Sequence, residues 1–454
     1  MPKVIVDGIE VEVELGSTVL QACEAAGKEI PRFCYHERLS IAGNCRMCLV
    51  EMEKSHKPVA SCAMPAVDGQ VIKTNTSMVK KAREGIMEFL LINHPLDCPI
   101  CDQGGECDLQ DQAFNYGGGR SRYELNKRSV DQKYMGPLIK THMNRCIHCT
   151  RCVRFSEEVA GISEIGAVNR GENMEITTFL EQAVESEMSG NIIDLCPVGA
   201  LTSKPYSYEA RPWELNKVET IDVMDAVGSN IRMDSKGWEV KRVLPRINDD
   251  INEEWISDKT RFACDGLLNN RIDAPFIKKN GKLKEVSWKK ALDFIQDNIK
   301  DKKTFGGIVG QLIDLETSYA FKKFFKDVFE SECVDFRQKD ILFDTSNHFN
   351  FKFNTSINEI EKCDFILLVG TNPRYEATIV NSRIRKAVKN GSKVFSIGDP
   401  GELHYKYKVI GNNLTILDDL INSKISEANI LKESKNPAII IGESVLKSNI
   451  SKYV

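Results

Sequence analysis

The sequence predicts an α+β chain of several domains, and three observations support this fold class. A strand–turn–strand–helix pattern opens the chain, eleven cysteines then fall into three spaced groups before residue 200, and buried strands alternate with a helix from about residue 360. A chain of 454 residues is long for one domain, so about two to four domains are expected.

Composition and charge argue against two classes of partner, nucleic acids and membranes, and favour metal or redox chemistry. The formal net charge of −4, with 42% hydrophobic and 28% charged residues, gives no argument for binding nucleic acid or an anionic membrane surface. No run of about eighteen apolar residues occurs, so we expect no direct membrane insertion. The strand pattern starts at Lys3, which we expect to leave no room for a signal or transit peptide. Many cysteines without an export signal favour metal or redox chemistry over disulfides.

The first element is a predicted hairpin. Residues 3–13 alternate around Asp7-Gly8, a pair typical of a two-residue turn. A helix is expected next, with Ser17 as its N-cap and Gly27 as its C-cap. Two strands, a helix and a cysteine-rich loop follow the order of a β-grasp ferredoxin.

A second helix is expected over residues 78–93, because its apolar positions recur at helical spacing. Ser77 would cap it and His94-Pro95 would end it. Residues 97–125 are rich in glycine and polar residues, and we expect a loop that a ligand must order.

The last part of the chain shows α/β periodicity. Residues 363–369, 393–397 and 438–442 are short apolar runs typical of buried parallel strands, and residues 377–389 have the pattern of a helix between the first two. Earlier, residues 238–243 alternate as a half-buried strand does.

The first cysteine group has the ligand number and order of a two-iron site. Cys34, Cys45, Cys48 and Cys62 are separated by ten, two and thirteen residues. Two residues between Cys45 and Cys48 let both side chains point toward the same iron region, and Gly43 would supply a tight turn. The first gap is longer than in plant-type ferredoxins. From spacing alone, a zinc site remains an alternative.

The second group contains a histidine. His94 precedes Cys98, Cys101 and Cys107 at spacings of three, two and five residues. A neutral imidazole can occupy one corner of a four-iron cluster, and replacing a thiolate makes the site less negative, which raises its potential. The alternatives are a zinc knuckle, or a histidine that merely caps a helix C-terminus.

The third group has the run of a bacterial ferredoxin. Cys146, Cys149 and Cys152 are two residues apart, and Cys196-Pro197 follows at a distance. No second run of this type occurs, so Cys196 most simply closes the same four-iron cluster. His148, inside the run, is expected at the surface or beside the ligands rather than as a ligand.

Other residues near the groups have weaker signals. Arg145, Arg151 and Arg154 are expected to screen cluster charge, with a solvated basic face as the alternative. Cys23 is expected in a helix core rather than among the ligands.

Four stretches resemble the large iron–sulfur subunit of the NADH–quinone oxidoreductases of respiratory complex I, which is the G subunit of the bacterial enzymes. They are residues 32–48, 94–112, 144–155 and 194–201. The resemblance implies one 2Fe-2S cluster on the first group and one 4Fe-4S cluster on each of the other two. It continues through residues 211–275, similar to the small iron–sulfur domain of molybdopterin oxidoreductases, and reaches residues 368–374, similar to their α/β core.

Two features depart from the family pattern. Some members hold an extra four-iron cluster with four cysteines in the stretch near residues 220–265, where this chain has only Cys264, so we predict that this cluster is absent. The chain is also short for the family, as a fragment or a reduced form would be. We expect no molybdopterin, and we expect Cys264, Cys333 and Cys363 to be buried apolar residues.

The resemblance implies five domains, which we expect in this order: a β-grasp 2Fe-2S ferredoxin-type domain over residues 1–78, a 4Fe-4S domain with one histidine ligand over 79–118, a 4Fe-4S ferredoxin-like domain over 119–212, a molybdopterin-oxidoreductase-type domain without its cluster over 213–271, and a partial molybdopterin-oxidoreductase-like α/β domain over 272–454.

The implied function is electron relay from NADH and flavin toward quinone in a proton-translocating assembly, with no catalytic residues of the chain's own. Its partners would be a flavin-bearing, NADH-oxidising subunit and a quinone-side iron–sulfur subunit, in a heteromultimer on the cytoplasmic side of a bacterial inner membrane, or the matrix side in mitochondria. The glycines at 306–310 lack the setting of a dinucleotide fingerprint. The alternatives are the diaphorase iron–sulfur subunit of a soluble hydrogenase or formate dehydrogenase, and a scaffold that has lost its metals.

Overall fold

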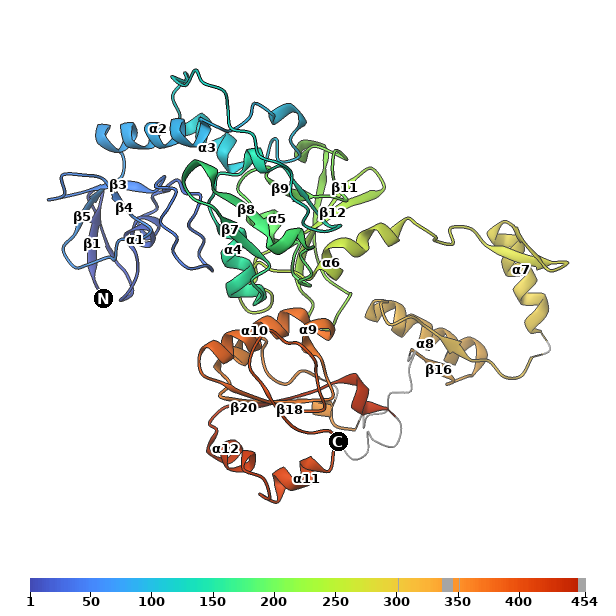
Figure 1. Cartoon of the computed structure of the whole chain (residues 1–454). Coiled ribbons are helices and arrows are strands. Elements are labelled where there is room, and N and C mark those ends of the chain that lie inside the picture. The colour runs from blue at the N-terminus through green and yellow to red at the C-terminus, as the bar shows by residue number, and fades with distance from the viewer. Residues whose placement is uncertain (301, 337–345, 351, 448–454) are drawn as a thin grey trace. The chain divides into compact units, whose positions relative to one another are not determined.

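The computed structural model describes residues 1–300, 302–336, 346–350 and 352–447 (Figure 1). It divides into two compact units. One contains residues 1–218, 232–244 and 255–261, and the other contains residues 219–231, 245–254 and the described chain from residue 262. None of the helices in the described ranges is long and apolar enough to cross a bilayer.

The N-terminal domain is built on the predicted hairpin. Asp7 and Gly8 have φ of 47° and 87°, the left-handed pair that a tight hairpin turn requires. The sheet has the order β2-β1-β5-β3-β4, and β1 runs parallel to β5. Cys23 is fully buried in its core, as expected. The strands are β1 Lys3–Val6, β2 Ile9–Glu12, β3 Leu49–Met52, β4 Val59–Ala60 and β5 Val71–Lys73.

Helix α1, Val19–Ala25, is capped differently from the prediction. Thr18 and not Ser17 is its N-cap, because the Thr18 hydroxyl accepts from the Gln21 amide while the Gln21 side chain accepts from the Thr18 amide. This reciprocal pair satisfies two backbone donors that the first turn leaves free. At the other end Ala26 is the C-cap.

Two further helices frame the second ligand group. Helix α2, Ser77–Leu91, has Thr76 as its N-cap rather than Ser77. The prediction of a loop over residues 97–125 is wrong for α3, Asp108–Tyr116, which places two acidic residues in its first turn and buries Leu109. Acidic side chains near a helix N-terminus stabilise it, a signal that the high polarity of the stretch obscured.

Short paired strands carry the third ligand group. β6, Ile139–Thr141, pairs antiparallel with β9, Leu201–Ser203. The first ends just before the Cys146 run and the second starts just after Cys196, so this ladder brings the run and the remote cysteine together. The neighbouring elements are α4 Arg151–Phe155, β7 Ile165–Val168, β8 Glu175–Thr178 and α5 Asn191–Leu195.

A three-stranded sheet of order β10-β11-β12 follows. Trp238, at the turn between its last two strands, is fully exposed, and the strand that we expected from residue 238 begins at Glu239. The elements from here to residue 336 are β10 Asn216–Ile221, β11 Asn230–Lys236, β12 Glu239–Pro245, α6 Asp258–Phe262, β13 Phe276–Lys279, β14 Lys282–Glu285, α7 Trp288–Ile299, β15 Gly307–Ile308, α8 Leu315–Phe329 and β16 Val334–Asp335.

The predicted α/β pattern is confirmed at the end of the described chain. Four parallel strands have the order β19-β18-β17-β20, and β17 is buried along its whole length. Helices α9 and α10 lie on one face of this sheet, and α11 and α12 on the other (Figure 1). The elements are β17 Phe365–Val369, α9 Pro373–Glu376, α10 Thr378–Lys389, β18 Lys393–Ile397, β19 Lys408–Gly411, α11 Ile416–Ile421, α12 Glu427–Glu433 and β20 Pro437–Ile441.

Candidate iron–sulfur sites

The first group lies in the loop between α1 and β3 and just after β4. Its four cysteines, Cys34, Cys45, Cys48 and Cys62, are at most 9% exposed. The Cys34 amide donates to the sulfur of Cys45 at 3.4 Å, and hydrogen bonds from the Cys45 and Cys62 thiols lower the pKa of Cys34. A hydrogen bond with Cys62 likewise lowers the pKa of Cys48 to about 6. The four cysteines are therefore buried neighbours, and four thiolates are the donor set that a two-iron cluster takes.

A left-handed turn makes this convergence possible. Gly43 has a φ of 59° and Arg46, on the other side of Cys45, has a φ of 62°. The predicted turn at Gly43 is thus present, and glycine adopts it without steric cost.

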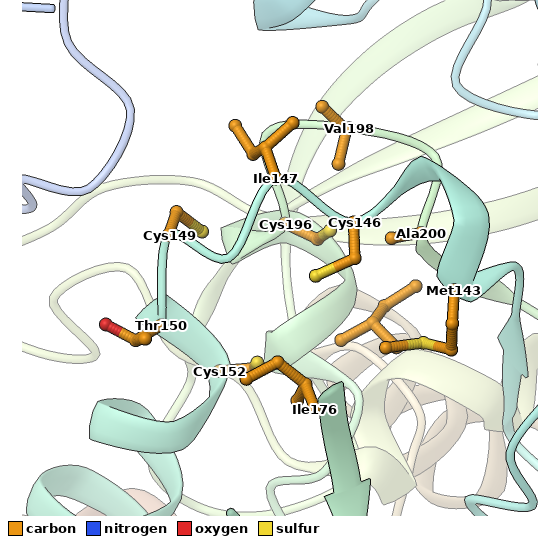
Figure 2. A pocket seen from close by; sticks show the side chains of 11 residues that line it. Met143, Cys146, Ile147, Cys149, Thr150, Cys152, Ile176, Cys196, Val198 and Ala200 are labelled. Atoms are coloured by element: carbon orange, nitrogen blue, oxygen red, sulfur yellow. The ribbon is translucent and has the colours of Figure 1, made fainter. Parts of the chain in front are cut away.

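The third group surrounds a cavity (Figure 2). Cys146, Cys149, Cys152 and Cys196 line it together with apolar side chains such as Met143. Burial raises the pKa of Cys146 and Cys196 to about 12 and also raises the pKa of Cys149 and Cys152. Without iron these thiols keep their protons at neutral pH, so iron binding must displace them. A cavity lined by four sulfurs and apolar side chains fits a 4Fe-4S cluster.

The second group lies between α2 and α3. Cys101 and Cys107 are buried and Cys98 is exposed. Burial, with the positive charge of Arg145 second, lowers the pKa of His94 to about 4, so the imidazole is neutral, as a metal ligand must be. The His94 Nδ1 atom is buried without a hydrogen-bond partner. A buried polar atom without a hydrogen-bond partner costs about 1–3 kcal/mol of folding free energy, and coordination to iron would remove this cost.

In the described chain, no three His, Cys, Asp or Glu side chains close on the position of one metal ion. The assignment of iron to the twelve residues therefore stays a prediction, supported by their donor chemistry and burial.

The arginines near the third group are buried, so the alternative of a solvated basic face is wrong. Arg145 is 2% exposed, and Arg151 and Arg154 are each 8% exposed. His148 is half-buried, and its backbone amide, rather than its ring, donates to the sulfur of Cys146 at 3.4 Å.

The first and third groups are in direct contact. The Arg154 guanidinium donates to the carbonyl oxygens of both Cys34 and Cys149. Nearby, the Asn44 side chain donates to the His148 carbonyl at 3.1 Å. Each of these contacts joins a ligand, or the neighbour of a ligand, in one group to its counterpart in the other.

The third and second groups are also in contact. The Cys107 thiol donates to the Pro197 carbonyl at 3.7 Å, and a Cβ on Gly199 would overlap the sulfur of Cys101. Arg145 donates to the Gly199 carbonyl at 3.4 Å. The loop that follows Cys196 therefore lies directly against the second group.

The first and second groups also touch, but this contact lies farther along the chain from their cysteines than the two contacts described above. Gln112, within α3, donates to the Arg32 carbonyl at 2.9 Å, five and two residues from the nearest ligands. The third group in sequence is therefore the middle group in space, which the order of the motifs does not indicate.

The cysteines outside the groups differ in burial. Cys363 is buried, as expected, and Cys264 is half-buried. The prediction for Cys333 is wrong, because its side chain is exposed. It precedes β16, a two-residue strand that pairs only with the two-residue β15, and so small a sheet covers little surface.

Models of five protein families match the chain in succession. Their descriptions and matched residues are a 2Fe-2S iron-sulfur cluster binding domain over 3–77, an NADH-ubiquinone oxidoreductase-G iron-sulfur binding region over 83–122, the ferredoxin-like domain of NADH-quinone oxidoreductase subunit 3 over 136–202, the 4Fe-4S domain of the NADH-ubiquinone oxidoreductase NDSU1/NuoG-like family over 215–265, and molybdopterin oxidoreductase over 271–452.

Individual relatives agree. The G subunit of NADH-quinone oxidoreductase from Rickettsia felis is 57% identical over 98% of this chain and 67% of its own length. The chain belongs to the family of NADH-quinone oxidoreductase G subunits. The NADH-ubiquinone oxidoreductase 75 kDa subunit of Reclinomonas americana is 52% identical over 98% of the chain and 67% of its own length. This G-subunit chain spans about two-thirds of the length of these curated relatives.

Membership of the G-subunit family confirms the fold class and the prediction of an electron-transfer iron–sulfur subunit in a heteromultimeric complex. The structure of an NAD+-reducing NiFe hydrogenase in the H2-reduced state is 27% identical with a TM-score of 0.41, and the match covers 46% of this chain and 90% of that one.

Proposed function

We propose that this chain relays electrons through three iron–sulfur sites in the order first, third and second group. The 2Fe-2S cluster would lie on Cys34, Cys45, Cys48 and Cys62, the middle 4Fe-4S cluster on Cys146, Cys149, Cys152 and Cys196, and the last 4Fe-4S cluster on His94, Cys98, Cys101 and Cys107. The carrying observation is that the third group contacts each of the other two at ligand residues, through Arg154 on one side and Gly199 on the other.

The chain's own residues would set the potentials and the separation of the sites. The clusters, when bound, supply one-electron oxidation and reduction. Because a neutral His94 replaces a thiolate, the last site carries less negative charge than the other four-iron site. Its reduction potential is raised as a result, which favours electron transfer to it. Burial of the first group, and of three of the four cysteines of the third group, limits the access of oxidants in solution to these sites.

The ends of this order suggest where partners bind. A flavin-bearing, NADH-oxidising subunit would deliver electrons at the first group. A quinone-side iron–sulfur subunit would accept them at the second group, where Cys98 is the one proposed ligand that the described chain leaves exposed. The relatives' names support such an assembly, which would place the chain on the cytoplasmic face of a bacterial inner membrane or the mitochondrial matrix face.

We propose that the remainder of the chain binds neither a fourth cluster nor molybdopterin. Cys264 is the one cysteine between residues 213 and 271, and a four-iron cluster needs about four ligands. Around Gly370, after β17, the space is filled by the chain itself, since a Cβ there would overlap Val445 and the Ser444 hydroxyl donates to the Gly370 carbonyl.

Anaerobic purification from the native membrane tests this function. EPR spectra should show one two-iron and two four-iron signals from this subunit, and a flavin subunit and a further iron–sulfur subunit should co-purify. Isolation as part of a soluble hydrogenase, or iron near zero in an active preparation, would contradict the proposal.

A further inference from the structure

One turn of helix α4 carries a ligand between two buried cations. Arg151 and Arg154 flank Cys152, and each residue is 8% exposed. Burying a guanidinium costs several kcal/mol unless hydrogen bonds and counter-charge offset the lost hydration. Each arginine must therefore be held by specific partners.

Arg154 is held by the backbone of two ligand loops. Its guanidinium donates to the carbonyl oxygens of Cys34 and Ser40 in the first group and of Cys149 in the third, and its Nε donates to the Thr150 hydroxyl at 3.4 Å. The planar fork of arginine spreads five donors over fixed directions and reaches acceptors on two loops at once, whereas the three donors of a lysine sit on one compact, mobile ammonium group.

None of these hydrogen-bond partners carries a negative charge. In the described chain, every acceptor of Arg154 is a carbonyl or hydroxyl oxygen, and none is a carboxylate. Arg151 differs, because it donates to the Tyr35 carbonyl at 2.8 Å but also lies 3.9 Å from the Asp108 carboxylate. The two thiolate sets that face Arg154 would supply its missing counter-charge.

We propose that Arg154 is the positioning residue of the first junction, by which we mean the contact between the first and third groups. It fixes the two-iron loop against the middle four-iron loop, and its positive charge raises the reduction potentials of both sites. The inference rests on the proposed function, since it needs anionic clusters on both groups. A fixed positive charge favours the reduced, more negative form of each cluster, and a low local dielectric strengthens this effect. The His94 site, which Arg154 does not contact, should be unaffected.

Redox-titrated EPR of the intact complex with Arg154→Gln separates these roles. Removing the charge should shift the reduced-to-oxidised ratio of the two flanking sites about tenfold toward oxidised at a fixed potential, which is about 59 mV for one electron. Arg154→Lys keeps the charge but loses the fork, so potentials should stay near wild type while electron transfer between the two sites, followed by freeze-quench EPR, slows. Arg170→Gln, at an exposed position, is the matched control.

The outcomes distinguish this inference from the function beneath it. Normal iron content and spectra with unchanged potentials in Arg154→Gln would overturn the charge role, and an unchanged transfer rate in Arg154→Lys would overturn the positioning role. If Arg154→Gln does not assemble, the Lys variant still decides. A wild-type complex without a two-iron signal from this chain would instead contradict the proposed function.

Discussion

The two junctions between the ligand groups are built in different ways. Between the first and third groups, long side chains reach across and donate to backbone carbonyls, above all Arg154. Between the third and second groups the backbones themselves meet, because Gly199 has no side chain to hold them apart. The charged side chains that cross there have carboxylate partners, as Arg145 has Asp97 at 3.0 Å and Arg151 has Asp108 at 3.9 Å. The first junction therefore affects mainly the charge around the two sites that it joins, and the second affects mainly the distance between its two sites.

The largest effect should follow from filling the second junction. Gly199→Ala would place a methyl group on the sulfur of Cys101, which the closely packed loop cannot accommodate. We expect loss of the His94-site cluster, so that iron falls from about ten to about six atoms per chain. Gly166→Ala, with no atom near its added Cβ, is the control. Full iron and an unchanged third signal would contradict a contact junction.

The next largest effect should be a change in the reduction potential of the His94 site. His94→Cys replaces a neutral ligand with an anionic one, so the cluster should remain while its potential falls, and the two other sites should stay as they were. EPR during a redox titration measures all three together. A potential at the wild-type value would remove His94 from the ligand set.

A smaller effect should come from the Arg145–Asp97 ion pair, one of the charged contacts of the second junction. Asp97→Asn would leave Arg145, which is 2% exposed, without its carboxylate. Buried pairs broken in this way cost about 3–5 kcal/mol, but the Asp97 side chain is 34% exposed, so we expect about 1–2 kcal/mol. Denaturant unfolding of the variant beside the wild type would show this loss, and equal midpoints would mean that the bridge is incidental.

The smallest effect concerns pH in the iron-free chain. Burial raises the pKa of Cys146 and Cys196 from 9.0 to about 12. An acid whose folded pKa is raised contributes stability that is present below pH 9 and is lost as pH rises from 9 toward 12. In the wild-type chain this thiol lowers the free energy of unfolding by about 1 kcal/mol as the pH rises from 8 to 10, and Cys196→Ala should remove that part of the decrease. The same slope in both proteins would show that the thiol is not buried.

Sequence reasoning reached the local chemistry but not the arrangement. The hairpin at Asp7-Gly8 and the strand β17 follow from short-range patterns, and the structure confirms both. Ser17 and Thr18 both carry a hydroxyl group, so the sequence does not tell which of them caps α1. The side-chain geometry of Thr18 and Gln21 decides it.

The order of the sites could not be predicted because it depends on contacts between residues far apart in the chain. Arg154 meets Cys34 across 120 residues, and the role of Gly199 is visible only once Cys101 lies against it. A basic residue near a ligand run and a glycine after Cys-Pro have many ordinary explanations, so neither signals a junction alone.

The distances between paramagnetic sites test the central claim most directly. In pulsed EPR of the partly reduced complex, we predict that the two-iron site couples most strongly to the Cys146-group cluster, and that this cluster couples in turn to the His94-site cluster. A two-iron site closer to the His94-site cluster than to the Cys146-group cluster would contradict the order of the relay.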